Sequence, residues 1–178
     1  MKFVATDVAG VFIVEISPLD DDRGFFARTF DADAFDLAGL VSSFPQHSIA
    51  QNILAGTIRG LHYQSAPHME TKIVRCTKGA LFDVAVDIRR DSPTYGRFAA
   101  ARLDDRNARA LYVPAGCAHG YQTLEPDTWA AYAISVPHAP DFARGIRYDD
   151  PSLAIPWPLP VATISERDRQ WPYLAPLD

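Results

Sequence analysis

Hydrophobic and polar residues alternate over several short stretches of the chain, and this alternation is its clearest local pattern. Within Leu81–Ile88, Phe82, Val84 and Val86 lie on one face of an extended chain, and the residues between them lie on the other. A period of two is that of a half-buried β-strand, so this stretch predicts a strand. Shorter stretches of the same character are Val11–Glu15, Thr57–Gln64, Lys72–Thr77, Gly96–Leu103, Ala110–Val113 and Thr128–Val136.

Turn-forming residues separate these stretches, and signals for helices are few. Many short strands at this spacing predict an antiparallel sandwich or a barrel-like jelly roll. We expect short helices at its periphery, and a proline-rich, irregular segment over residues 137–160. The two predicted helices, which begin at residues suited to cap them, are Asp31–Leu40 and Ser165–Trp171. The whole of residues 1–178 is expected to form one mainly-β domain.

Composition narrows the class of protein without indicating its chemistry. The chain is 48% hydrophobic and 22% charged, as in ordinary globular proteins. No apolar run approaches the roughly 18 residues that span a membrane, and Asp7 interrupts the N-terminal stretch, so we expect no signal peptide. Two cysteines make no disulfide framework, which favours the cytoplasm. The net charge of -5 and the lack of a basic stripe argue against nucleic-acid binding.

The first candidate for chemistry is the stretch Thr57–Gln64, which contains Gly60 in the middle of a predicted strand. In a regular strand, Arg59 and His62 would face opposite ways. A glycine inside a strand often marks a bulge or a close approach of the backbone to a ligand. A bulge at Gly60 would let Arg59 and His62 converge. The alternative is a surface arginine and a core histidine.

Lys72 and Tyr132 are further candidates within predicted strands. Lys72 shares a face with Val74 and Cys76, so its ammonium points inward if that face is the core face. Because lysine is rarely buried without a partner, an inward Lys72 indicates an anionic ligand or a developing oxyanion. The alternative is an ammonium that reaches water at the strand end. Tyr132 has small neighbours such as Ala130, which leave room at its hydroxyl; the alternative is a packed core tyrosine.

A metal site is a further possibility to weigh. Residues 114–119 have the pattern Pro-x-Gly-x-x-His, which resembles the second motif of cupins, where the histidine often binds a metal. His62, His119 and Glu70 could form a facial triad for such a metal. However, Gln64 stands where the first cupin motif has its second histidine, and a lysine lies close by. We therefore expect no metal ligands here.

Asp168 has two compatible interpretations. It follows Ser165 at the spacing of a capping box, in which it would be the acidic half. Its carboxylate could also orient an imidazole and raise the basicity of that ring, as in many catalytic dyads.

Taken together, these motifs resemble the dTDP-4-dehydrorhamnose 3,5-epimerase family. The resemblance extends from about Asp21 to Pro172. It implies a cupin-like jelly roll, usually a homodimer, that acts on nucleotide-linked 4-keto-6-deoxy sugars without a metal or organic cofactor. The motifs that carry it are, in order, DDRGFFARTF (Asp21–Phe30), GTIRGLHYQ (Gly56–Gln64), ETKIVRCTKGALFDVAVDIRRDSPTYG (Glu70–Gly96), LYVPAGCAHGYQTL (Leu111–Leu124), DDPSLAIPWP (Asp149–Pro158) and ISERD (Ile164–Asp168).

The resemblance also implies roles for individual residues. By motif position, His62 would be the general base, paired with Asp168. Tyr132 would be the opposing acid, and Lys72 would lie beside the sugar carbonyl. The residues implied around the substrate are Arg23, Arg59 and His119 at the sugar and pyrophosphate, Gln46 and Ser48 near the nucleotide, and Phe26 stacked on the base.

The chain departs from the family pattern at positions that would face the nucleotide. Arg28 replaces a usual glutamate near the thymine base, and His138 replaces a frequent tyrosine that can stack on it. Ala133 and Ala143 replace a lysine and a glutamate. The implied catalytic residues match the family pattern, while the residues that would face the nucleotide do not. The resemblance therefore supports epimerisation better than it supports specificity for thymidine. Another nucleotide, or inversion at one carbon only, stays open.

Two other classes of protein stay open at this point. One is a cupin metalloenzyme that uses His62 and His119, which metal analysis of the purified protein would reveal. The other is a sugar-nucleotide binding protein or a 4-keto-sugar ketoisomerase. The position of deuterium taken up from heavy water distinguishes a ketoisomerase from an epimerase.

Overall fold

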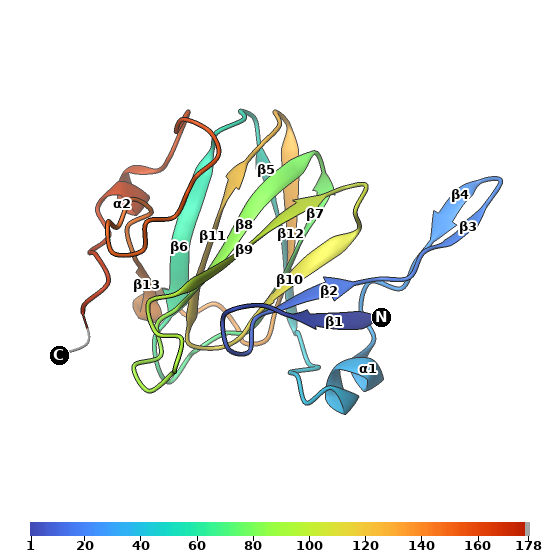
Figure 1. The fold of residues 1–178 in the computed structure, drawn as a ribbon, viewed down its shortest axis with the longest axis horizontal. Coiled ribbons are helices and arrows are strands. Elements are labelled where there is room, and N and C mark those ends of the chain that lie inside the picture. The colour runs from blue at the N-terminus through green and yellow to red at the C-terminus, as the bar shows by residue number, and fades with distance from the viewer. Residues whose placement is uncertain (177–178) are drawn as a thin grey trace.

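The computed structural model describes residues 1–176 and shows two antiparallel β-sheets packed face to face (Figure 1). The first sheet has the strand order β1 (Lys2–Ala5), β2 (Phe12–Glu15), β10 (Arg109–Val113), β7 (Lys72–Lys78), β12 (Thr128–Ile134) and β5 (Gln46–Asn52). The second has the order β13 (Ala143–Gly145), β6 (Ile58–Gln64), β11 (Cys117–Thr123), β8 (Ala80–Asp87) and β9 (Phe98–Asp104). The mainly-β jelly roll predicted from the alternation is confirmed.

Each predicted strand matches an observed strand to within a few residues, but alternation misses strands of two kinds. Every residue of β11 is buried, so no polar face exists to produce a pattern. At the sheet edge, β5 exposes most of its length and shows no hydrophobic face. The remaining missed strands are β1, the three-residue strand β13, and the three-residue strands β3 (Leu19–Asp21) and β4 (Gly24–Phe26).

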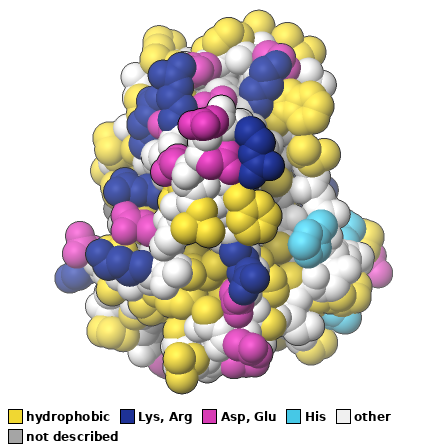
Figure 2. All heavy atoms as spheres, turned by 90° about the vertical axis from the view of Figure 1, so that its right-hand side faces the viewer, with side chains coloured by type: hydrophobic (Ala, Val, Ile, Leu, Met, Phe, Trp, Pro, Cys, Tyr) yellow, Lys and Arg dark blue, Asp and Glu magenta, His cyan; other side chains and the backbone are white. Residues whose placement is uncertain are grey.

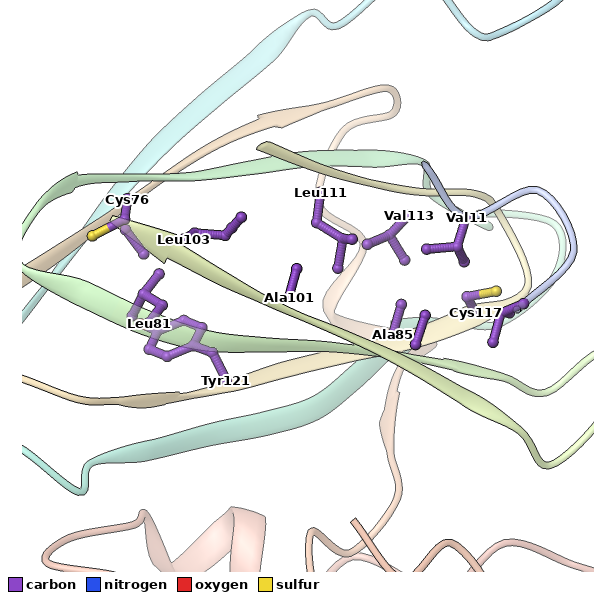
Figure 3. Close-up of a cluster of buried hydrophobic side chains, with 13 residues drawn as sticks. Val11, Cys76, Leu81, Ala85, Ala101, Leu103, Leu111, Val113, Cys117 and Tyr121 are labelled. Carbon is purple, nitrogen blue, oxygen red and sulfur yellow. The ribbon is translucent and has the colours of Figure 1, made fainter. Parts of the chain in front are cut away.

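Hydrophobic side chains from both sheets meet in the space between them. Figure 3 shows Cys76 and Leu111 of the first sheet opposite Leu81, Leu103 and other residues of the second. The face that Lys72 shares with Cys76 is therefore the core face, as the sequence pattern required for an inward lysine. The interior of the sandwich is apolar around this cluster, so polar side chains buried near it require hydrogen-bonding or charged partners.

The second sheet is buried on its outer face as well. Val84 and Val86 of β8 pack against Ile146 and Leu153, which belong to the chain that follows β13. Both faces of β8 are therefore buried, whereas the alternation in Leu81–Ile88 predicted one buried face and one face exposed to solvent. As a result, Asp83 is fully buried, and a carboxylate in such a place needs a specific partner.

The two predicted helices are present and short. α1 (Ala32–Leu37) is capped by Asp31, whose carboxylate accepts a hydrogen bond from the Ala34 backbone at 3.2 Å. α2 (Glu166–Arg169) is capped by the Ser165 hydroxyl, which accepts from the Asp168 backbone at 3.1 Å. The proline-rich segment contains only β13 and a 3₁₀ turn as regular structure, close to the irregular segment expected. Within residues 1–176, no helix is long and apolar enough to cross a membrane.

A hairpin of β3 and β4 projects from the sandwich as an arm (Figure 1). It carries three strongly exposed apolar side chains: Leu19 at 70%, Phe25 at 57% and Phe26 at 71%. Figure 2 views the molecule from the side of this arm, where hydrophobic side chains lie among acidic and basic ones. Exposed aromatic side chains on a projecting hairpin are typical of a surface that contacts another molecule.

Candidate active site

A cavity of about 690 Å³ opens between the two sheets. Strands of the first sheet (β5, β7 and β12) line it together with strands of the second (β6, β11 and β13), and α2 borders it. A ligand in this cavity therefore contacts side chains from both sheets at once. The predicted site residues that line it are Ser48, Arg59, His62, Lys72, His119, Tyr132, His138 and Asp168.

The strand β6 enters the cavity through a bulge at Gly60. Two residues of β6, Gly60 and Leu61, lie opposite the single residue Gly120 of β11. Gly60 has a φ of 132°, and a Cβ at this position would lie 2.5 Å from the Gly120 Cα. Only glycine fits there. The predicted bulge is confirmed, and it turns both Arg59 and His62 toward the cavity.

His62 is held by the buried carboxylate of Asp168. The His62 Nε2 and Asp168 Oδ1 atoms are 2.6 Å apart, and the Gly60 N–H and Trp171 Nε1–H also donate to this carboxylate. Burial raises the pKa of the Asp168 carboxyl, but these hydrogen bonds outweigh it and hold that pKa below its ordinary value. Because an ionised carboxylate only accepts, the ring nitrogen facing Asp168 carries a proton and the other is basic.

Of the two interpretations of Asp168, the structure shows the one in which the carboxylate orients an imidazole. Ser165 caps α2 as expected, but the Asp168 side chain turns to His62 instead of completing a capping box. The short helix α2 thus places the carboxylate beside the imidazole from a distant part of the chain.

Lys72 lies inside the sandwich and pairs with Glu70. The Lys72 Nζ is 2.7 Å from the Glu70 Oε1, and each side chain is 10% exposed. The same Nζ lies 3.5 Å from the backbone oxygen of His62. The inward orientation of Lys72 is confirmed, and Glu70 supplies the negative partner that a buried ammonium requires. A lysine ammonium has three N–H donors, so it can bind a ligand oxygen beside this pair.

His119 and Tyr132 lie on facing sheets across the cavity. The His119 Nε2 is 2.8 Å from the Asp83 Oδ1, and the rings of His119 and Tyr132 meet edge to face at 6.1 Å. Burial raises the pKa of the Tyr132 hydroxyl well above its ordinary value, and contact with Tyr121 and the charge of Asp83 raise it further. Tyr132 therefore carries its proton at neutral pH.

The three side chains considered as a metal triad are each paired with a different charged partner. His62 pairs with Asp168, His119 with Asp83, and Glu70 with a lysine. Among residues 1–176, no group of three or more His, Cys, Asp or Glu side chains is arranged to hold a metal ion. The arrangement is instead one of separate acid–base pairs around a common cavity.

The comparisons agree with this geometry. The family model described as dTDP-4-dehydrorhamnose 3,5-epimerase matches residues 5–176. The enzyme of that name from Pseudomonas aeruginosa is 40% identical over 100% of this chain and 98% of its own. The chain belongs to the dTDP-4-dehydrorhamnose 3,5-epimerase family. The crystal structure of the Bacillus anthracis enzyme, with TDP and PPi bound, has a TM-score of 0.94 and 38% identity, covering 97% of this chain and 99% of its own.

A second solved member of the family has a sugar nucleotide bound. The Legionella pneumophila epimerase, in complex with dTDP-4-keto-L-rhamnose, has a TM-score of 0.91 and 35% identity, and covers 97% of this chain and 92% of its own. The cupin-like jelly roll implied by the resemblance is thereby confirmed. At this level of identity, the fold and the general chemistry of the epimerase family apply to the whole chain.

Four residues implied for nucleotide binding in the epimerase family lie outside the cavity lining of the described chain: Arg23, Phe26, Arg28 and Gln46. Arg23 and Phe26 belong to the projecting arm or its turn. The Arg28 Nη1 lies 2.7 Å from the Asp31 Oδ2, and Arg28 is mostly exposed. Gln46 is closer, because its side-chain oxygen accepts from the backbone of His138, which lines the cavity.

The cavity also contains residues that sequence reasoning missed as parts of the site. Tyr121 lies two positions after His119 on the same strand, so the period of two could have placed it on the same face. Arg167 and Trp171 adjoin the cavity because they flank Asp168. Glu70 was considered only as a metal ligand, and its pairing with Lys72 depends on a loop geometry that spacing does not predict.

Proposed function

We propose that the protein inverts C3, C5 or both of a nucleotide-linked 4-keto-6-deoxyhexose by proton transfer through an enolate. The observation that carries this proposal is the cavity that holds a carboxylate-bound histidine and a protonated tyrosine on facing sheets. Family membership and the sugar nucleotide bound by the Legionella pneumophila relative support the substrate class. Proton uptake from heavy water, described in the Discussion, tests the proposal.

His62 acts as the base in this proposal. A proton on the carbon next to a ketone is weakly acidic, so its removal requires a nearby base and a stabilised enolate. Asp168 fixes the tautomer of the His62 ring and stabilises the imidazolium that forms when His62 takes up the substrate proton. The Lys72 ammonium stabilises the enolate oxygen in a cavity of low dielectric, usually the largest single contribution in such a reaction.

Tyr132 acts as the acid that completes inversion. A base alone returns the proton to the face from which it came, and the original epimer results. His62 lies on β6 of the second sheet and Tyr132 on β12 of the first, so a sugar ring between the sheets presents opposite faces to them. Proton delivery by Tyr132 then inverts the centre. General acid–base steps of this kind contribute about 10²- to 10⁴-fold each.

The protein is also proposed to be a homodimer whose arms complete the nucleotide sites. Phe26 is strongly exposed on the arm and lies outside the cavity lining of its own protomer. Exchange of the arms between two copies would cover these apolar side chains and bring Arg23 and Phe26 to the partner's cavity. The partner proposed for the protein is a nucleotide sugar, and neither a nucleic acid nor a membrane is proposed. The cytoplasm remains the predicted location.

We expect sedimentation equilibrium at micromolar concentration to give a mass of about twice the 19.7 kDa of one chain, because exposed sheet edges and aromatic side chains favour association. The Phe26→Ala variant should still sediment with the mass of the dimer, but it should bind the nucleotide more weakly. A mass near 19.7 kDa for the natural protein at that concentration would contradict the dimer.

Arg28 is expected to weaken the preference for thymine. Arginine only donates hydrogen bonds, so it cannot accept the N3–H of thymine as a carboxylate would. The loss of one such bond corresponds to about ten- to hundred-fold in affinity. We therefore expect UDP, CDP or GDP to compete with dTDP in calorimetry, and Arg28→Glu to restore discrimination. A hundredfold preference for dTDP in the natural protein, unchanged by Arg28→Glu, would mean that another residue such as Gln46 recognises the base.

A further inference from the structure

Asn52 is a buried amide at the end of the edge strand β5. Most side chains of this strand are exposed, but only 2% of the surface of Asn52 is exposed. Asn52 lies outside the cavity lining, so it has no direct contact with a ligand in the cavity. A buried amide is costly unless its donors and acceptors are hydrogen-bonded, and the partners of Asn52 connect it to the cavity.

Two neighbours fix the orientation of the Asn52 amide. Its nitrogen donates to the backbone oxygen of Thr128 on β12 at 3.0 Å, and its oxygen accepts from the Arg59 Nε on β6 at 2.7 Å. A backbone oxygen only accepts and a guanidinium only donates, so the amide cannot be turned over without losing both bonds. The Tyr121 hydroxyl donates to the same amide oxygen at 3.2 Å. Asn52 therefore presents only an acceptor to Arg59.

The end of β5 holds one edge of the Arg59 guanidinium. The Asn52 Oδ1 accepts from its Nε, and the backbone oxygen of Gln51 accepts from its Nη2 at 3.2 Å. The guanidinium is planar with five N–H groups, so these two bonds leave three N–H groups, including a parallel pair on Nη1 and Nη2. Arg59 lines the cavity, and both acceptors on β5 are neutral, so they leave its positive charge available to a ligand.

We propose that Asn52 is a positioning residue for Arg59, and that it aims the parallel N–H pair of the guanidinium at the diphosphate of the nucleotide sugar. Phosphate oxygens accept bidentately from such a pair, which adds both strength and direction to the contact. Arg59 is an exposed residue, and an unrestrained guanidinium would lose conformational entropy when the ligand binds. Because Asn52 holds the guanidinium beforehand, ligand binding does not bear that cost. This role rests on the proposed function, because it requires a nucleotide diphosphate as ligand.

The test of this role is the binding of dTDP by the Asn52→Ala variant, measured by calorimetry. The variant keeps the charge of Arg59 but frees its side chain, so the affinity for dTDP should decrease by about two- to ten-fold. The KM for the nucleotide sugar should rise by a similar factor. The rate at saturating substrate should be unchanged, because the diphosphate is bound alike in the ground state and the transition state. Thermal unfolding checks that the variant is folded.

A double variant shows whether Asn52 acts through Arg59. In an Arg59→Ala background, Asn52→Ala should cause no further loss of affinity for dTDP. Gln51→Ala is the matched control, because Gln51 is the neighbouring amide on β5 and its side chain donates to Asp127 at 2.8 Å. The backbone oxygen that holds Arg59 is retained in this control, which should bind dTDP as the natural protein does.

Arg59→Lys separates the orientation of the guanidinium from its charge. It alters an exposed side chain, so it gives a folded protein even if Asn52→Ala does not. Lysine keeps the positive charge but presents a point charge instead of a planar pair of donors. The affinity of Arg59→Lys for dTDP should therefore decrease at least as far as that of Asn52→Ala.

The outcomes separate the role of Asn52 from the function on which it rests. Natural affinity for dTDP in Asn52→Ala or in Arg59→Lys would overturn the positioning role, as would an equal loss with and without Arg59. A lower rate at saturating substrate with an unchanged KM would overturn it too. The proposed function would stand in each case, because deuterium exchange by the natural protein tests it separately. Failure of the natural protein to bind dTDP would instead contradict the proposed substrate class, and the role of Asn52 with it.

Discussion

His62→Asn should abolish the incorporation of solvent deuterium into a 4-keto sugar nucleotide while the fold is retained. The reason is that His62 is the base held against the ionised Asp168, and asparagine has no basic nitrogen. Loss of a general base corresponds to a decrease of about 10²- to 10⁴-fold. Proton NMR in heavy water measures the exchange rate, and circular dichroism checks the fold.

The matched control for this variant is His47→Asn, because His47 is exposed on the edge strand β5 and lies outside the cavity lining. Its exchange rate should equal that of the natural protein. Substantial deuterium exchange by the His62→Asn variant would contradict the assignment of His62 as the base.

Tyr132→Phe should fail in a different way, with exchange retained and inversion lost. In this variant, His62 still removes a proton and returns a deuteron to the same face of the ring. The opposite face lacks its acid, so inverted product should decrease by about 10²- to 10⁴-fold. NMR separates the two results, because the remaining protons of exchanged substrate keep the chemical shifts of the original epimer, whereas those of the inverted product do not.

The two variants serve as controls for each other, because His62→Asn should lose both exchange and inversion, whereas Tyr132→Phe should lose inversion only. Inversion at the natural rate by Tyr132→Phe would show that water or another group delivers the proton. A loss of exchange equal to the loss of inversion would show that Tyr132 supports the cavity as a whole rather than one step.

The sequence predicted those parts of the site that depend on strand periodicity. Periodicity offered an inward Lys72 as one of two interpretations, because its face is shared with Val74 and Cys76, and the structure places it inside. A bulge at Gly60 was likewise one of two interpretations, because a glycine inside a strand often marks one, and the structure shows the bulge. Both inferences use rules that act over a few residues.

The parts that could not be predicted depend on contacts between distant segments. Asp83 belongs to a strand with two buried faces, so alternation could not show that its carboxylate meets His119. The arm carries Phe26 away from its own cavity, and no local pattern indicates that separation.

The most direct test of the central claim is incubation of the natural protein with dTDP-4-keto-6-deoxyglucose in heavy water, followed by proton NMR. If the protein is an epimerase, deuterium appears at C3, C5 or both, and each inverted centre carries deuterium while the carbonyl stays at C4. An inverted, deuterium-labelled centre at C3 alone would identify epimerisation at one carbon, and inverted, labelled centres at both C3 and C5 would identify a double epimerase. No uptake of deuterium, or deuterium at C3 with migration of the carbonyl, would contradict epimerisation.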